Sequence, residues 1–377
     1  MTPLNVAVCG GGRTGHLNTV LFKTLPAVRV SLLTQRQDVI DRYSDGQPFT
    51  ALLPDGRALV ARPDRVSSDP AVVVHDADVV VITVPAHARP AVLSSIADRL
   101  PRDRPVYVGA IPGFCGFDLL AEKMLTDRPQ AVIWGMKDVP HTAFGLRPGV
   151  SVRMGGAKSV LHVATHDRET PVARQRLRET VQRLFESPVE LLRDYLEITL
   201  TPANPIMHSS AIYGLIGPYG QWHDRLIPRL VSWWTECSEL GAYFMQRSDE
   251  ENQRLCKAAE QQIGVDLASV KPLKQEIVEA YGAQITDTRT LLSVLRTNRA
   301  YHSIQAPLVA HGDGYVMDRQ SRAFQEDVAF GLSTLVQVGN RLNVPLPHIE
   351  EIYTWCASYM GGVSRSARDY FPPNWPA

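Results

Sequence analysis

A glycine-rich turn near the N-terminus is the feature that most constrains how this chain folds. Residues 10–15, with the sequence GGGRTG, directly follow an apolar stretch of strand character, residues 5–9, and precede a stretch of helical character, residues 17–25. Glycines cluster in many turns, but a strand before them and a helix after them are the context that a dinucleotide-binding turn requires. The order of these three segments therefore predicts such a turn.

The positions of the glycines fit that prediction. In a dinucleotide-binding turn the first glycine makes the tight bend, the second lets the backbone approach the pyrophosphate, and the third lets helix and strand pack closely. Gly10, Gly12 and Gly15 have this spacing. The start of the following helix has unpaired N–H groups and a partial positive charge that attract phosphate, and Arg13 and Thr14 are further candidate cofactor residues in this turn.

The first half of the chain predicts an α/β fold. From residue 5 to about residue 153, short β-branched runs alternate with helical stretches, which is the pattern of a Rossmann domain, a doubly wound and mostly parallel sheet covered by helices. Residues 49–66 contain two short extended runs around a Pro-Asp-Gly turn, which predicts an antiparallel hairpin added to that sheet. We expect this first domain to span residues 1–187.

The second half of the chain has a different character. Apolar residues recur there at spacings of three and four, for example in residues 225–245 and 322–342, and this spacing predicts helices. We therefore expect residues 188–377 to form an all-α domain.

Charge and composition narrow the class of partner. The 39 basic residues balance 39 acidic residues, and neither sign gathers in a long block, which argues against nucleic acid and against a membrane surface. No stretch approaches the ~20 apolar residues that cross a bilayer. Five scattered cysteines suggest neither a disulfide framework nor a paired-cysteine zinc site. We expect a cytoplasmic protein with small-molecule partners.

The residues after the second predicted strand bear on the choice of cofactor. An NAD-preferring domain places an acid there, whereas this chain has Thr34, Gln35 and Arg36. The planar guanidinium of Arg36 can bind a 2′-phosphate, with Thr34, Gln35 and Arg13 as further donors. The pattern favours NADP. NAD stays open, because Arg36 can also be a solvated surface residue and Asp38 lies close by.

Val84 and Pro85 follow another predicted strand, residues 78–82. Ligands of open α/β sheets bind at the carboxyl ends of the strands. We therefore expect these two residues to flank the nicotinamide end of the cofactor.

His208 is the first candidate catalytic residue. Asn204 and Pro205 are favoured at the start of a helix, so His208 would fall in the first turn, on an apolar face. Partial desolvation and a positive helix end favour the neutral imidazole, which needs a carboxylate partner to act as an acid near neutral pH. The alternative is a structural histidine in an apolar core.

Asp327 is the candidate partner of that histidine. It lies within the apolar stripe of the helix predicted over residues 322–342, where a carboxylate needs a partner. We expect the adjacent Glu326 to point elsewhere, into solvent. Arg322, near the start of the same helix, can make a two-point contact with a substrate carboxylate. Local capping or pairing of Asp327 remains the alternative. We assign no metal, because His162 and His166 share a strand face without a third ligand.

Taken together, these segments resemble the octopine/nopaline dehydrogenase family, the opine dehydrogenases. The resemblance consists of the Gly-x-Gly-x-x-Gly turn, an Asn-Pro-x-x-His motif at residues 204–208 and an Arg-x-x-x-x-Asp motif at residues 322–327. It covers both halves of the chain.

The resemblance implies a reaction. Members of the family use NAD(P)H to condense an α-keto acid with the amino group of an amino acid or related amine, through an imine that hydride reduces. It also implies a His208–Asp327 dyad whose imidazolium polarises the keto oxygen and relays protons. Arg322 would hold the keto acid with its carbonyl carbon toward the nicotinamide, and the protein would be a homodimer.

Residues 207–214 and 217–222 are most similar to the bacterial branch that makes opine metallophores, of the staphylopine, pseudopaline and yersinopine type. That branch implies a nicotianamine-like amine, pyruvate or 2-oxoglutarate as the keto acid, and NADPH. The chain is short for that branch, and residues 135–140 do not match the aromatic-and-arginine loop of the classical enzymes. Five aromatic residues are candidates for a substrate-cleft wall or for helical core: Tyr213, Tyr219, Trp222, Trp233 and Trp234.

Two other functions stay open. A simple keto-acid or hydroxy-acid reductase on a similar two-domain plan would need no amine. A non-catalytic NADP-binding sensor would bind the cofactor without turnover.

Overall fold

The computed structural model describes residues 3–201, 203–220 and 226–376. The chain divides into two compact units, Met1–Ile198 and Thr199–Ala377. The expected boundary after residue 187 lies before this division, because strand β12, Val189–Leu191, still pairs with strand β11, Leu161–Thr165, in the sheet of unit 1.

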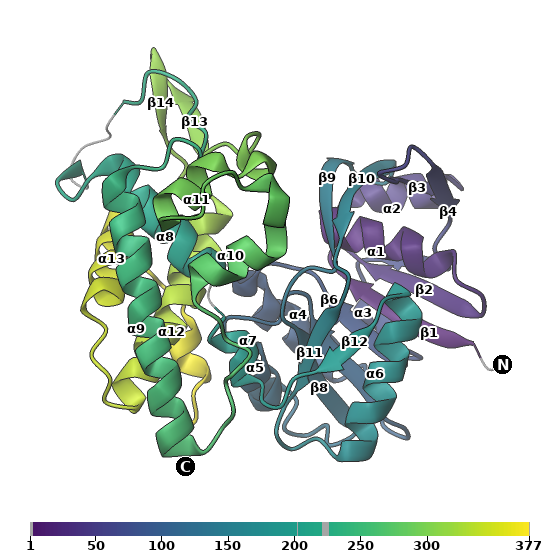
Figure 1. Cartoon of the computed structure of the whole chain (residues 1–377). Helices are drawn as coiled ribbons and strands as arrows, with labels where there is room; N and C mark the ends of the chain where they lie inside the picture. The colour runs from purple at the N-terminus through teal and green to yellow at the C-terminus, as the bar shows by residue number, and fades with distance from the viewer. Residues whose placement is uncertain (1–2, 202, 221–225, 377) are drawn as a thin grey trace. The chain divides into compact units, whose positions relative to one another are not determined.

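An eight-stranded sheet forms the centre of unit 1 (Figure 1). Its order is β12-β11-β8-β7-β6-β1-β2-β5; neighbours from β8 to β5 run parallel, and β11 is antiparallel to β8. The remaining strands are β1 Leu4–Cys9, β2 Val28–Leu33, β5 Arg65–Ser67, β6 Val79–Ile82, β7 Val106–Ala110 and β8 Ala131–Met136. The predicted mostly parallel sheet is confirmed. Its order reverses between β1 and β6, where open α/β sheets bind their ligands.

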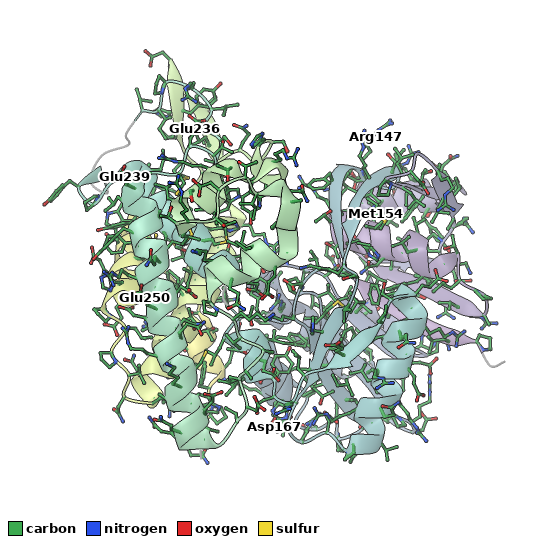
Figure 2. All side chains as sticks on the ribbon, in the orientation of Figure 1. Arg147, Met154, Asp167, Glu236, Glu239 and Glu250 are labelled. Carbon is green, nitrogen blue, oxygen red and sulfur yellow. The ribbon has the colours of Figure 1, made fainter. Side chains whose placement is uncertain are left out.

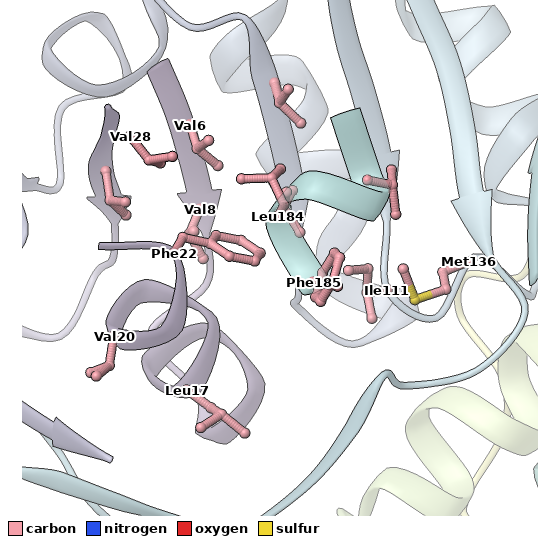
Figure 3. Packing of buried hydrophobic residues seen from close by; sticks show 14 of the residues in the cluster. Val6, Val8, Leu17, Val20, Phe22, Val28, Ile111, Met136, Leu184 and Phe185 are labelled. Atoms are coloured by element: carbon pink, nitrogen blue, oxygen red, sulfur yellow. The ribbon is translucent and has the colours of Figure 1, made fainter. Parts of the chain in front are cut away.

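Helices connect and cover these strands. They are α1 Arg13–Lys23, α2 Gln37–Ser44, α3 Pro70–Val74, η1 Ala86–Ala88, α4 Arg89–Ala97, α5 Phe117–Met124, α6 Pro171–Phe185 and α7 Leu196–Thr199. Helix α1 is buried on more than one side. Phe22 lies beside Val8 of β1, while Leu17 and Val20 point away from that strand, and all three belong to one buried cluster with Val6 and Val8 (Figure 3). This packing fixes the start of α1 beside the carboxyl end of β1.

The hairpin predicted in residues 49–66 forms, but it does not extend the main sheet. Strands β3, Phe49–Leu52, and β4, Ala58–Ala61, pair antiparallel. They belong to a separate sheet of order β4-β3-β10-β9, with β9 His141–Arg147 and β10 Ser151–Ala157. The prediction of an addition to the parallel sheet is wrong, because β3 pairs in parallel with β10.

Unit 2 is helical, as predicted, with one addition. Its segments are α8 Ala203–Ile216, α9 Glu239–Ile263, α10 Leu273–Tyr281, η3 Gly282–Gln284, α11 Leu291–Thr297, η4 Arg299–Tyr301, η5 Ala323–Leu332, α12 Ser333–Arg341, α13 Pro347–Tyr359 and η6 Ala367–Tyr370. An antiparallel hairpin, β13 Leu308–His311 with β14 Gly314–Met317, interrupts them. Its turn contains Gly312-Asp313, and Gly312 has a positive φ of 56°. Hairpin turns that need a positive φ favour glycine, so this pair is a recognisable sequence signal.

The helix predicted over residues 225–245 begins later than expected. Arg225 lies outside the described residues, and α9 starts at Glu239 after Ser238, whose hydroxyl accepts the N–H of Gly241. Residues 226–238 instead pair with distant backbone, as in the N–H of Trp233 that donates to the carbonyl of Ile304 at 2.8 Å. Within the described residues, no helix is long and apolar enough to cross a membrane.

Candidate active site

The three motif glycines occupy different steric environments in unit 1. Gly10 has a φ of +136°, which L side chains rarely adopt. A Cβ on Gly15 would lie 1.8 Å from the carbonyl oxygen of Gly10, so the crossing of helix and turn excludes any side chain there. Apart from its two chain neighbours, no described residue has an atom within 4 Å of a Cβ placed on Gly12. Gly12 precedes α1 as its N-cap, so open space lies beside the first N–H groups of the helix.

A cavity of about 570 Å³ lies against this turn. Of the ten predicted cofactor residues, six line it: Gly10, Gly12, Thr34, Gln35, Arg36 and Val84. The other four follow closely in the chain, with Arg13, Thr14 and Gly15 in the first turn of α1 and Pro85 directly after Val84. The first turn of α1 contains no acidic residue, so nothing there opposes the attraction of the helix end for an anion.

The segment after β2 holds its side chains in place by short-range hydrogen bonds. The hydroxyl of Thr34 accepts the N–H of Arg36 at 3.2 Å, and the amide of Gln35 donates to the carbonyl of Ser68 at 3.3 Å. Arg36 forms a two-point ion pair with Asp38, at 2.6 and 3.1 Å, and both side chains are about half exposed. This hydrogen bond holds the pKa of the Asp38 carboxyl below its ordinary value.

His208 and Asp327 come together in unit 2. Nδ1 of His208, on α8, lies 2.7 Å from Oδ2 of Asp327, on η5. Asp327 is 1% exposed, and the side chain of His208 is 20% exposed. Burial raises the pKa of the Asp327 carboxyl, although the charge and hydrogen bond of His208 oppose that shift. With a carboxylate as acceptor, Nδ1 carries the proton, and Nε2 is the nitrogen that can exchange a proton with a substrate.

Two tryptophans stack on the imidazole. The ring of Trp233 lies 4.3 Å from that of His208, centroid to centroid, at an angle of 18°. The ring of Trp234 lies 5.6 Å from the imidazole at 22° and 5.0 Å from Trp233 at 6°, so the three rings form a compact group. Rings stacked on the imidazole restrict its plane and offer it apolar contact area. Both tryptophans belong to the irregular segment before α9, in which Figure 2 labels Glu236.

Arg322 lies at the start of η5 and pairs with Glu326. Its Nε donates to Oε2 of Glu326 across one turn, with half of the arginine side chain exposed and the glutamate fully buried. The prediction that Glu326 points into solvent is therefore wrong. The physical reason is that η5 is a π-helix, which has more residues per turn than an α-helix, so consecutive residues are rotated less and both neighbouring acids are buried.

The helix that carries His208 starts slightly earlier than predicted. It begins at Ala203, and the preceding residue, Pro202, lies outside the described residues. His208 is therefore the sixth residue of α8 rather than a residue of its first turn.

Comparison with known proteins gives consistent matches. The model of the NAD/NADP octopine/nopaline dehydrogenase alpha-helical domain matches residues 191–360. The protein y4xO of Sinorhizobium fredii, which carries no described function, is 50% identical over 376 residues, 99% of each chain. The octopine dehydrogenase of Mizuhopecten yessoensis is 27% identical over 379 residues, which cover 96% of this chain and 91% of that protein. The chain belongs to the opine dehydrogenase family.

Solved structures agree with this fold. An octopine dehydrogenase with NADH and L-arginine superposes with a TM-score of 0.83 at 23% identity, covering 95% of this chain and 90% of that one. A yersinopine dehydrogenase with NADP⁺ has a TM-score of 0.71 at 12% identity, with 95% and 91% covered. As an opine dehydrogenase, the protein is an NAD(P)-dependent oxidoreductase that acts on CH–NH groups, and its type of reaction is the reductive condensation of a keto acid with an amino acid.

The sequence of this opine dehydrogenase did not reveal every residue of the cavity in unit 1. Further lining residues are Cys9, Gly11, Leu33, Ala88, Ala91, Val92, Ser95 and Leu146. Ala91, Val92 and Ser95 lie on one face of α4, a spacing that the sequence contains. Leu146 comes from β9, in the second sheet, and carries no sequence signal. A Cβ on Gly11 would lie 2.2 Å from the hydroxyl oxygen of Thr34, so this position needs glycine too.

The remaining aromatic candidates lie apart from the dyad's ring stack or outside the described residues. Tyr213 donates from its hydroxyl to Glu351 at 2.5 Å and packs in the helical core, and Tyr219 is 80% exposed. Trp222 lies outside the described residues.

His162 lies 3.4 Å from Glu190. In the part of the chain that the structure describes, no three His, Cys, Asp or Glu side chains are grouped so that they could hold a metal ion.

Proposed function

We propose that this opine dehydrogenase condenses pyruvate or 2-oxoglutarate with the amino group of an amino acid or nicotianamine-like amine, with NADPH as the preferred reductant. The observation that carries the proposal is the His208–Asp327 pair, a 2.7 Å hydrogen bond to a carboxyl that is 1% exposed. Such a pair orients one imidazole nitrogen and leaves the other for proton transfer.

The dyad supplies the proton transfers that the condensation needs. Protonated Nε2 of His208 donates its proton to the keto oxygen as the amine attacks the carbonyl carbon. The attacking nitrogen then returns a proton to Nε2, which donates it again when that oxygen leaves as water and the imine forms. Asp327 keeps the proton on Nδ1 and balances the charge of the imidazolium. Trp233 covers one face of the ring and restricts its plane.

Arg322 binds the carboxylate of the keto acid in this proposal. A guanidinium offers a planar set of donors that matches a carboxylate, and a two-point contact restricts how the neighbouring carbonyl can turn. About half of its side chain is exposed, so a small anion can reach it.

The residues of unit 1 fit a dinucleotide. The cavity of about 570 Å³, the absence of any atom near a Cβ on Gly12 and the start of α1 without an acid together make a cradle for a pyrophosphate. When bound, the reduced nicotinamide supplies the hydride that converts the imine into the secondary amine. Gly10, Gly12, Arg13, Thr14 and Gly15 would hold the phosphates in the proposed site, while Val84 and Pro85 would lie toward the nicotinamide.

The preference for NADPH rests on Arg36, with Thr34 and Gln35 beside it in the cavity. The two-point pair with Asp38 weakens this argument, because a 2′-phosphate must compete with that carboxylate for the guanidinium. We keep NADPH as the proposal, since no carboxylate occupies positions 34–36 themselves.

The comparisons favour an ordinary amino acid over a nicotianamine-like amine as the first substrate to try. The octopine dehydrogenase of Mizuhopecten yessoensis is 27% identical to this chain, while the yersinopine dehydrogenase is 12% identical. A role in metallophore biosynthesis is the second candidate and rests on the resemblance of residues 207–214 to that branch. We also propose that the protein is cytoplasmic and forms a homodimer. Light scattering of the purified protein tests the oligomeric state.

One experiment tests the function. Oxidation of NADPH and of NADH is measured with pyruvate or 2-oxoglutarate, each with and without amino acids and a nicotianamine-like amine, for the wild type and His208→Ala. Turnover that requires both substrates and is lost in the variant supports the proposal. Turnover with a keto acid alone indicates a simple reductase, cofactor binding without turnover indicates a sensor, and equal activity of His208→Ala contradicts the dyad.

A further inference from the structure

Glu326 is a fully buried carboxylate that the proposed function does not use. It is 0% exposed, lies one residue before Asp327, and accepts a hydrogen bond from Nε of Arg322. A buried charge is strongly unfavourable unless a partner compensates it. The position of Glu326 therefore commits it to a cation, and that cation is the arginine to which the proposed function assigns the keto acid.

We propose that Glu326 is a positioning residue that orients the guanidinium of Arg322 for the carboxylate of the keto acid. This inference rests on the proposed role of Arg322. A guanidinium binds a carboxylate well only in its own plane, because its N–H donors form a rigid fork. A bond from Nε to a buried acceptor removes much of the rotational freedom of that plane before any substrate binds. Preorganisation of this kind strengthens binding by reducing the entropy lost on association.

The π-helix explains why a separate carboxylate is needed for this task. Its backbone hydrogen bonds join residues five apart, so residues four and five positions after Arg322 both lie close to it along the helix. Those residues are Glu326 and Asp327. Their charges reach Asp327: the charge of Arg322 lowers the pKa of the Asp327 carboxyl, and the charge of Glu326 raises it.

Each of the two neighbouring acids therefore pairs with a different basic side chain. Glu326 holds Arg322, and Asp327 holds His208. With an uncharged residue at position 326, Arg322 has only Asp327 as a nearby carboxylate on this helix. An arginine that turned toward Asp327 would be withdrawn from the substrate and would compete with His208. Glu326 therefore keeps the binding function and the proton-transfer function on separate side chains.

The first test is Glu326→Gln, which keeps the shape of the side chain and removes its charge. We expect the KM for the keto acid to rise about tenfold, as for the weakening of one charge-assisted contact. The KM for the amine and the affinity for NADPH should change less than about twofold, because those sites do not depend on Arg322. Gln325→Ala is the matched control; Gln325 lies next to Glu326 and donates to the carbonyl of Arg319, so the variant perturbs the helix without touching the pair.

A double-mutant cycle shows whether Glu326 acts through Arg322. In the Arg322→Ala background, Glu326→Gln should add little to the KM for the keto acid, because the group that it orients is gone. An equal rise in both backgrounds, or a parallel loss of NADPH affinity, would overturn the proposal in favour of a structural role. If Glu326→Gln fails to fold, Glu326→Asp keeps the buried charge, withdraws it from Nε, and should raise the same KM.

The outcomes separate this inference from the proposed function. If Arg322→Ala leaves the KM for the keto acid unchanged, the role of Arg322 itself is wrong. If Arg322→Ala raises that KM and Glu326→Gln does not, the role of Arg322 stands and the positioning role of Glu326 is refuted.

Discussion

Nδ1 of His208 lies 2.7 Å from Oδ2 of Asp327, although 119 positions separate the two residues in the chain. Helix α8 carries the first and the π-helix η5 carries the second, and these two segments pack directly on each other. The contact gives a buried carboxylate its partner and gives an imidazole a fixed orientation. Replacement of either residue should therefore affect chemistry more than binding.

Asp327→Asn should lower kcat by on the order of 100-fold or more. An amide at this position can donate to Nδ1 and so favours the tautomer that protonates Nε2 of a neutral ring, without balancing the charge of the imidazolium. The KM for the keto acid should change much less. Asp249→Asn is a suitable control, because Asp249 is a partly buried acid on α9 that accepts the N–H of Leu273 rather than a bond from His208. Steady-state kinetics decide, and similar kcat losses in both variants would argue against a specific role.

Trp233→Leu should lower kcat by about tenfold, because the stacked indole no longer restricts the plane of the imidazole whose Nε2 exchanges the proton. Trp233→Phe keeps an aromatic face and should retain most of the wild-type kcat. Steady-state kinetics measure the difference. Equal losses in both variants would indicate that Trp233 only supports packing.

Gly15→Ala should lower the stability of the fold, whereas Gly12→Ala should weaken cofactor binding and leave stability unchanged. A Cβ at position 15 would lie 1.8 Å from a backbone oxygen, so Gly15→Ala should destabilise the protein by about 2–4 kcal/mol. A Cβ at position 12 meets no atom, so Gly12→Ala should melt like the wild type and bind NADPH at least tenfold more weakly. Thermal denaturation and NADPH fluorescence measure the two effects. Unchanged affinity in Gly12→Ala would place the pyrophosphate elsewhere.

Arg36→Ala and Asp38→Asn should change cofactor preference in opposite directions. If Arg36 binds the 2′-phosphate, its loss should raise the KM for NADPH about tenfold or more and leave the KM for NADH nearly unchanged. Asp38→Asn removes the competing carboxylate and should lower the KM for NADPH. Initial rates with both cofactors test this. Equal effects of Arg36→Ala on NADH and NADPH would refute the assignment.

Asp118 should make stability depend on pH between about 4 and 7. Burial raises the pKa of its carboxyl to about 7 in the folded protein, whereas the unfolded chain has the ordinary value near 4. Between these values the folded state binds more protons, so the free energy of unfolding falls as pH rises and levels off above pH 7. Asp118→Asn should remove this slope and be about 2–4 kcal/mol more stable relative to the wild type at pH 8 than at pH 4. Urea denaturation at both pH values measures the difference, and identical slopes would contradict it.

Much of unit 1 follows from local patterns in the sequence. The order of strand, glycine turn and helix around Gly10 depends on interactions over a few residues, and the structure has it as β1, Leu4–Cys9, followed by α1, Arg13–Lys23. The helix expected over residues 225–245 is wrong over its first half for the opposite reason. Apolar residues recur there at helical spacing, but the segment pairs with distant backbone, as Trp233 does with Ile304, about 70 positions away.

The sequence by itself determined the class of fold, the cofactor turn and the residue types of the candidate site, because glycine sterics, strand and helix periodicity and the cost of burying a charge act locally. Only the tertiary structure decided which charges meet. The packing of η5 against α8 brings Asp327 to His208, and the π-helical turn buries Glu326 beside it and gives it Arg322 as a partner. A pattern that assumes 3.6 residues per turn sends Glu326 into solvent, whereas the larger number of residues per turn in the π-helix η5 leaves both neighbouring acids buried.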